Sequence, residues 1–105
     1  MSVEDGVYYN DLLSVYGKLL TEKHMAVADA YFGLDLSLGE IAEINGISRQ
    51  SVADALSATK RKLIDYEEKL GLLSLKTRLK RAVAEKDEKK AIEEIKIILG
   101  ENNPD

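Results

Sequence analysis

The sequence has no cysteine, a single histidine and no long apolar run. The lack of cysteine excludes disulfides, thiolate zinc sites and cysteine nucleophiles. With His24 as the single imidazole and no glycine-rich phosphate loop, we predict no metal, no cofactor and no enzymatic activity. No stretch of about 18 apolar residues occurs, so we predict no membrane insertion by a helix. The N-terminal residues lack the basic and apolar pattern of a signal peptide, which predicts a cytoplasmic protein.

The net charge is −4, but the charge is unevenly distributed along the chain. Residues 1–47 carry two lysines against eight acidic residues, a net charge of −6. Residues 48–84 carry nine lysines and arginines against four acidic residues, a net charge of +5. The overall charge argues against nucleic acid as a partner, whereas the positive segment keeps it among the candidates.

Apolar residues recur at steps of three and four along most of the chain, and strand-like alternation is nearly absent. At 105 residues, the chain is therefore predicted to be all-α, a compact helical domain of about six helices. We expect a helix-turn-helix domain over residues 1–84, followed by a C-terminal helix and tail over residues 85–105. The predicted helices cover about 5–19, 22–32, 38–44 and 49–70, followed by two amphipathic segments between 72 and 99. Thr21, Ser37 and Ser48 are the predicted N-caps of the second, third and fourth helices. Gly33 is predicted to be the left-handed C-cap of the second helix, and Gly100 is predicted to end the last.

A heptad-like row of apolar residues follows the longest predicted helix, ending where Gly71 breaks its register. The row consists of Val52, Leu56, Thr59, Leu63, Tyr66 and Leu70. The predicted core combines part of this row with the preceding segment, as Ile41, Ala42, Ile47, Val52, Leu56, Leu63 and Tyr66. This row and the two amphipathic segments after Gly71 together carry more apolar surface than one copy is expected to cover, which predicts a homodimer through the C-terminal helices. Segment 85–105 would then pack on the same domain or on the dimer partner.

The central segment has the signals of a helix-turn-helix. Ser37 and Glu40 have the spacing of a capping box at the start of a short helix. Asn45 and Gly46 then provide a turn, with Gly46 predicted to adopt a positive φ, and Ser48 caps the next helix. In this motif the second helix offers its first turns to the DNA major groove. The alternative interpretation is a helical corner used only for packing.

Several residues after the turn are candidates for contacts with nucleic acid. Ser48 leaves backbone amides at the helix end that can meet a phosphate. Arg49 and Gln50 can form bidentate hydrogen bonds with guanine and adenine, and Ala53 can touch a thymine methyl group. Ser57 faces outward on the same helix but adds no charge.

Three consecutive cations, Lys60, Arg61 and Lys62, lie about three turns further along the helix. They are too far from Arg49 to share a groove with it, but they can meet backbone phosphates. The alternative is a solvated basic face. Asp54, in contrast, would repel phosphates.

Four blocks within about residues 8–72 carry a family likeness, namely LTEK at 20–23, LSLGEIAE at 36–43, ISRQSVAD at 47–54 and DYEEKL at 65–70. In these blocks the sequence resembles the YlxM family, small bacterial helix-turn-helix proteins encoded beside components of the signal recognition particle. Residues 21–63 are more distantly similar to region 4 of sigma factors, which reads promoter DNA. The chain departs from the family's pattern at Ala53, Ala55 and Ser57-Ala58, where the family has an aromatic residue, asparagine and a Lys-Arg pair.

The resemblance implies a DNA-binding protein, with a regulatory link to the signal recognition particle pathway. Two functions from different classes therefore follow from the sequence. The first is a nucleic-acid-binding regulatory module. The second is a protein-interaction subunit that modulates the signal recognition particle machinery without sequence-specific DNA binding.

Overall fold

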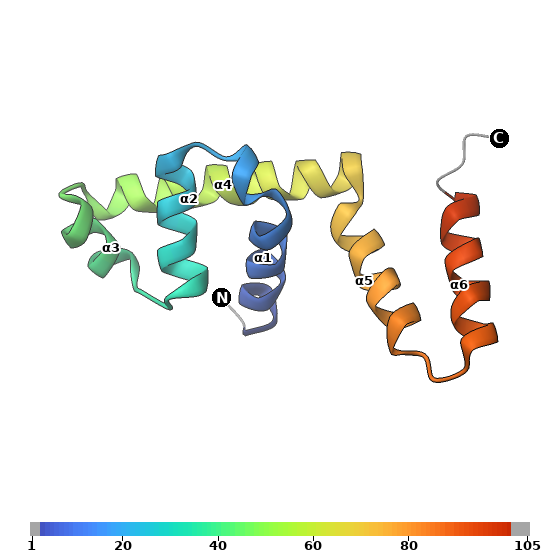
Figure 1. The fold of residues 1–105 in the computed structure, drawn as a ribbon. Coiled ribbons are helices and arrows are strands. Elements are labelled where there is room, and N and C mark those ends of the chain that lie inside the picture. Colours follow the sequence, from blue (N-terminus) through green and yellow to red (C-terminus); the bar gives the residue numbers. More distant parts are fainter. Residues whose placement is uncertain (1–2, 102–105) are drawn as a thin grey trace. The chain divides into compact units, whose positions relative to one another are not determined.

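The computed structural model describes the backbone of residues 3–101 and the side chains of residues 5–100. Within this range it contains six α-helices and no strand, so the predicted all-α fold is confirmed (Figure 1). No helix in the described range is long and apolar enough to cross a membrane. The helices are α1 (Val3–Tyr16), α2 (Glu22–Ala28), α3 (Leu38–Asn45), α4 (Arg49–Leu70), α5 (Leu72–Ala84) and α6 (Glu88–Glu101).

The chain forms two compact units, Met1–Leu70 with α1 to α4 and Gly71–Asp105 with α5 and α6. The predicted boundary after residue 84 differs from this division, because α5 pairs with α6, with an ion pair of 3.6 Å between Arg78 and Glu94. Gly71 ends α4 with a φ of +62°, a conformation that glycine adopts without strain. The packing of segment 85–105 on the same domain or on a dimer partner stays a prediction.

The core of the first unit lies where α2, α3 and α4 meet. Its buried side chains are Val27, Ile41, Ala42, Val52, Ala55 and Leu56. Further along α4, Thr59 and Leu63 are fully buried, and the Thr59 hydroxyl is satisfied by donating to the Ala55 carbonyl at 2.8 Å. Five of the seven predicted core residues are therefore confirmed as buried, namely Ile41, Ala42, Val52, Leu56 and Leu63.

The predicted row on α4 ends earlier than expected, and Ile47 is only half-buried. Tyr66 is also half-buried, because its hydroxyl stays at the surface and donates to the Leu19 carbonyl at 3.4 Å. Leu70, at the last residue of α4, is 54% exposed. The apolar row thus covers the core only as far as Leu63.

Helix α1 packs on α4 through a buried tyrosine. The Tyr16 side chain is fully buried, and its hydroxyl donates to Glu67 Oε1 of α4 at 2.6 Å. Leu12 and Leu13 are buried on the same helix. Helices α1, α2 and α3 all contact α4, which therefore serves as the common support of the unit (Figure 1).

Three predicted helix ends are wrong. The first helix ends at Tyr16, and a 3₁₀ turn (Gly17–Leu19) follows it. Gly33 is not a left-handed C-cap, because a π-helical turn (Asp29–Gly33) extends α2 and Asp35 takes the positive φ of 58° instead. At the C-terminal end, α6 continues through Gly100 to Glu101.

Candidate nucleic-acid interface

The turn between α3 and α4 is built by backbone hydrogen bonds around Gly46. Gly46 has a φ of +63°, as predicted, and its amide donates to the Glu43 carbonyl at 3.3 Å. The Ile47 amide donates to the Ala42 carbonyl at 3.1 Å. Together these two bonds form a Schellman motif, which satisfies the last carbonyls of α3 and fixes the direction in which the chain leaves it.

The predicted capping box at the start of α3 is confirmed. The Ser37 hydroxyl accepts from the Glu40 amide at 3.1 Å, and the Ser37 amide donates to Glu40 Oε1 at 3.1 Å. The hydrogen bond from the Ser37 amide to the ionised carboxyl lowers the pKa of Glu40, and the Ser37 side chain lowers it further. Both ends of α3 are thus fixed by local hydrogen bonds, so the position at which the chain enters α4 is well defined.

The predicted Ser48 cap at the start of α4 is also present. Its hydroxyl accepts from the Ser51 amide at 3.0 Å and donates to Ser51 Oγ at 2.9 Å. Within the described residues, no acceptor is recorded for the amides of Arg49 and Gln50. These two donors point out of the helix end, the arrangement that suits an anion.

The outward face of α4 begins with two exposed polar side chains, Arg49 and Gln50. Gln50 Nε2 donates to Asp54 Oδ1 at 2.9 Å, which holds the amide group in one orientation. Further along the face, Ser57 is exposed and Ala53 is half-buried. Neither side chain is charged, so this part of the face offers few polar contacts. Eleven residues separate Gln50 from Arg61, which corresponds to about three turns or roughly 17 Å, so Arg61 lies on the same face.

The three predicted phosphate-binding cations have different surroundings. Lys60 is half-buried, and its Nζ lies 5.2 Å from the centroid of the Tyr9 ring and 5.8 Å from that of Phe32. These distances are typical of cation–π contacts, which tie Lys60 to the aromatic side chains of α1 and the π-helical turn. Lys62 instead donates to Nδ1 of His24 at 3.3 Å. Only Arg61 projects freely from the outward face.

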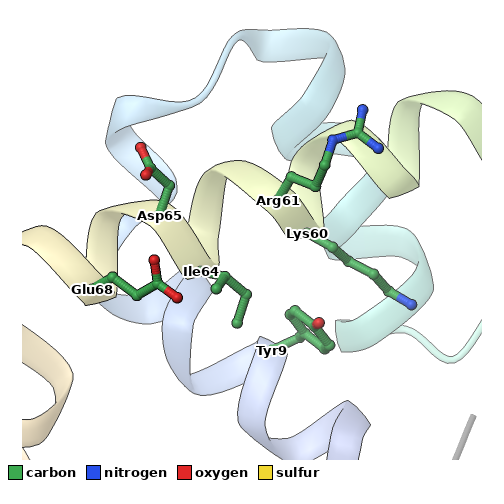
Figure 2. A pocket seen from close by; sticks show the side chains of 6 residues that line it. All are labelled: Tyr9, Lys60, Arg61, Ile64, Asp65 and Glu68. Carbon is green, nitrogen blue, oxygen red and sulfur yellow. The ribbon is translucent and has the colours of Figure 1, made fainter.

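Figure 2 shows a shallow pocket of about 320 Å³ beside these cations. Lys60, Ile64 and Glu68 lie on the side of Tyr9, and Arg61 points away from the tyrosine ring (Figure 2). Asp65, on the Arg61 side, is engaged by Lys69 at 2.9 Å. The carboxylates Asp65 and Glu68 thus lie at one end of the lining, and the cations Lys60 and Arg61 lie at the other (Figure 2).

Sequence reasoning did not find Lys23 and His24, at the start of α2. Both line a pocket of about 340 Å³ on the other side of α4, together with Ser51, Asp54, Ala55 and Ala58. With Lys62 beside His24, they form a basic cluster next to the outward face. No periodicity reveals this contact, because it joins residues 38 positions apart.

The pKa of His24 depends on the charges of this cluster. Burial lowers its pKa below the ordinary value of 6.5, and the positive charges of Lys62 and Lys23 lower it further. The folded protein therefore favours the neutral ring. Because the unfolded chain binds this proton more readily, the contribution of His24 to stability is present above pH 6.5 and is lost as the pH falls through its folded pKa.

An NMR pH titration of the His24 ring is expected to give a pKa below 6.5, with unambiguous signals because the chain has one histidine. Lys62→Gln should raise that pKa, since it removes a neighbouring positive charge. Lys69→Gln is the matched control, because Lys69 pairs with Asp65 instead. An unchanged His24 pKa in Lys62→Gln would show that the two side chains are not in contact.

The family comparison matches this architecture over nearly the whole chain. Residues 3–99 match the model of the UPF0122 family, described as "Putative helix-turn-helix protein, YlxM / p13 like". The chain belongs to the UPF0122 family. The resemblance to YlxM proteins is therefore confirmed, and the helix-turn-helix formed by α3, Gly46 and α4 fits this family description.

Curated relatives support the same assignment. A UPF0122 protein of Desulforamulus reducens is 51% identical over 65 residues, which cover 62% of this chain and 56% of the relative. A UPF0122 protein of Clostridium acetobutylicum is 44% identical over 71 residues, 68% of this chain and 61% of the relative. A third, from Clostridium kluyveri, is 45% identical over 74 residues, 70% of this chain and 67% of the relative. The matched stretch thus spans less than two thirds of the first two relatives.

Proposed function

We propose that this protein binds duplex DNA in a regulatory role, with the first turns of α4 in the major groove. The observation that carries the proposal is the exposure of Arg49 and Gln50 at the start of a helix whose direction is fixed by the Gly46 turn. In helix-turn-helix proteins, residues at this place contact base edges.

The proposed contacts with bases come from Arg49 and Gln50. Arg49 pairs with guanine through two donors of its guanidinium group. Gln50 pairs with adenine, using its carbonyl oxygen and the amide hydrogen that is not bonded to Asp54. Asp54 thus orients Gln50 rather than only repelling phosphates. Ala53 is small enough to meet a thymine methyl group.

The proposed contacts with phosphates lie beside this face and on it. Beside it are Lys23, His24 and Lys62, and on the outward face is Arg61. The free amides of Arg49 and Gln50 add donors at the helix end. Lys60 and Ser57 are left with supporting roles, Lys60 because its ammonium group lies on aromatic rings and Ser57 because it is uncharged. A phosphate beside His24 would stabilise the imidazolium form, so DNA binding should raise its pKa.

Arg49→Ala is expected to weaken binding to the preferred DNA site by about 1–3 kcal/mol and to reduce discrimination between sequences, because a bidentate base contact is lost. Lys62→Ala combined with Arg61→Ala should weaken binding to all DNA sequences alike, because two phosphate contacts are lost. The slope of the logarithm of the binding constant against the logarithm of the salt concentration should fall in magnitude by about two units. The measurement is a mobility-shift titration against a selected duplex and a scrambled duplex at two salt concentrations. Lys69→Ala is the control, as Lys69 lies at the far end of α4.

The proposal fails if the protein selects no duplex sequence at low salt, or if Arg49→Ala leaves discrimination unchanged. A second candidate is then favoured, a protein-interaction subunit of the signal recognition particle machinery. It is supported by the net charge of −6 in residues 1–47, which suits a basic partner. It is also supported by the short, uncharged side chains around Ala53 and Ala58, which offer few hydrogen bonds to bases. Signal-recognition-particle RNA in the same titration tests whether RNA replaces DNA.

A further inference from the structure

Helices α5 and α6 pack together as an antiparallel pair, joined by residues 85–87 (Figure 1). The row of α5 that faces α6 contains Arg78 and the buried Ala82, and the corresponding row of α6 contains Glu94 and the buried Ile98. The buried Ala82 and Ile98 and the ion pair of 3.6 Å between Arg78 and Glu94 show which sides of the two helices meet.

Each helix also carries a row of exposed apolar side chains, displaced by one residue from the row between the helices. In α5 these are Leu72, Leu79 and Val83, with exposed fractions of 43%, 38% and 83%. In α6 they are Ile92 and Leu99, with exposed fractions of 54% and 64%. Because the helices are antiparallel and the displacement is the same in both, the two rows lie on one face of the pair. We call these five residues the apolar face.

Lysines accompany the apolar face on both helices. By the helical repeat, Lys76 and Lys96 lie within the two rows, whereas Lys80 and Lys89 lie along the outer borders. All four are exposed, and none is paired with a carboxylate in the described residues. Glu88, at the start of α6, is the one carboxylate that the repeat places on this face between residues 72 and 100. The face therefore combines apolar side chains with a net positive charge.

We propose that the apolar face lies on an anionic lipid surface, with its leucine, isoleucine and valine side chains beneath the headgroups and the four lysines at the headgroup phosphates. Amphipathic helices with a basic border bind membrane surfaces in this way, parallel to the bilayer plane. Val83 and Leu99 protrude from the face, as insertion into lipid requires. This function goes beyond the proposed DNA binding and uses a different part of the chain.

The charges favour lipid over a second copy of the chain. In a two-fold symmetric dimer the same patch of each copy meets. Face-to-face packing would therefore bring four lysines of one copy toward four lysines of the other, with only Glu88 on each side to offset them. An anionic surface instead attracts every lysine and gains about 1 kcal/mol for each one near the headgroups.

The test is co-sedimentation of the full chain with vesicles of phosphatidylcholine alone or of phosphatidylcholine with phosphatidylglycerol. We expect binding to the anionic vesicles, weakened by added salt because the lysines are screened. Ile92→Glu should reduce partitioning about tenfold or more, since a carboxylate replaces an inserted apolar side chain. Lys80→Gln with Lys89→Gln should reduce it severalfold without disturbing the apolar residues.

Ile97→Glu is the matched control. Ile97 is 52% exposed on the same helix, close to the 54% of Ile92, but the helical repeat places it away from the apolar face. Partitioning of Ile97→Glu should equal that of the unmodified protein. The proposal is overturned if the protein ignores anionic vesicles, if both isoleucine variants lose binding equally, or if light scattering shows a dimer that Ile92→Glu dissociates.

Discussion

Leu56→Ala is expected to lower the free energy of unfolding by about 2–5 kcal/mol, a large share of the stability of a chain of this size. Leu56 is 6% exposed and belongs to the cluster in which α2, α3 and α4 meet. Truncation removes apolar contacts and leaves a cavity among Val27, Ile41 and Val52, which neighbouring helices can fill only in part. Chemical denaturation, followed by circular dichroism, measures the change.

Leu70→Ala provides the control on the same helix. Leu70 is 54% exposed, so its truncation removes little buried surface and should change the unfolding free energy by less than about 0.5 kcal/mol. Both substitutions alter helix propensity alike, so the difference between them reports burial. Equal effects would mean that α4 does not present its Leu56 side to the core.

The features that the sequence predicted well depend on neighbours in the chain. The Ser37–Glu40 capping box and the Ser48 cap are formed by residues three apart, so spacing alone identifies them. Gly46 and Gly71 directly follow the last residues of α3 and α4 and have positive φ, a conformation that glycine adopts without strain. Half of the candidate site, the start of α4 with Arg49 and Gln50, follows from these local signals.

The π-helical turn illustrates what local signals miss. Gly33 was predicted to end a helix through a positive φ, yet a side chain there would instead meet Asp29 Oδ1 at 3.0 Å. The wider turn places the Phe32 ring on that of Tyr9, with centroids 5.1 Å apart. Gly33 therefore has no positive φ, and the glycine after this apolar segment does not mark a left-handed helix end.

What the sequence does not reveal depends on contacts between distant segments. Lys60 and Lys62 look equivalent in sequence, but one lies over the Tyr9 ring and the other contacts His24. Their roles are decided by which helix packs on each side of α4. The division at Gly71 has the same origin, because α5 pairs with α6.

Gly46→Val is expected to destabilise the protein by about 1–3 kcal/mol and to weaken DNA binding more than this loss explains. A β-branched residue is strained at a φ of +63°. An added Cβ at Gly46 meets nothing within 4 Å, so the cost is backbone strain and not a clash. The strain is relieved if the turn changes shape, which would break the Ile47-to-Ala42 hydrogen bond and redirect α4 relative to α3. Denaturation and the mobility-shift titration, performed on the same variant, measure both effects.

Two controls separate strain from recognition. Gly46→Asn should retain most of the stability and DNA affinity, because asparagine tolerates the left-handed conformation. Gly71 has nearly the same φ, +62°, and equally open surroundings, but lies outside the helix-turn-helix. Gly71→Val should therefore leave the affinity for DNA unchanged at temperatures where the protein is folded. If Gly46→Val binds DNA as tightly as the unmodified protein, the direction of α4 set by this turn does not govern recognition, and the proposed docking of its first turns is wrong.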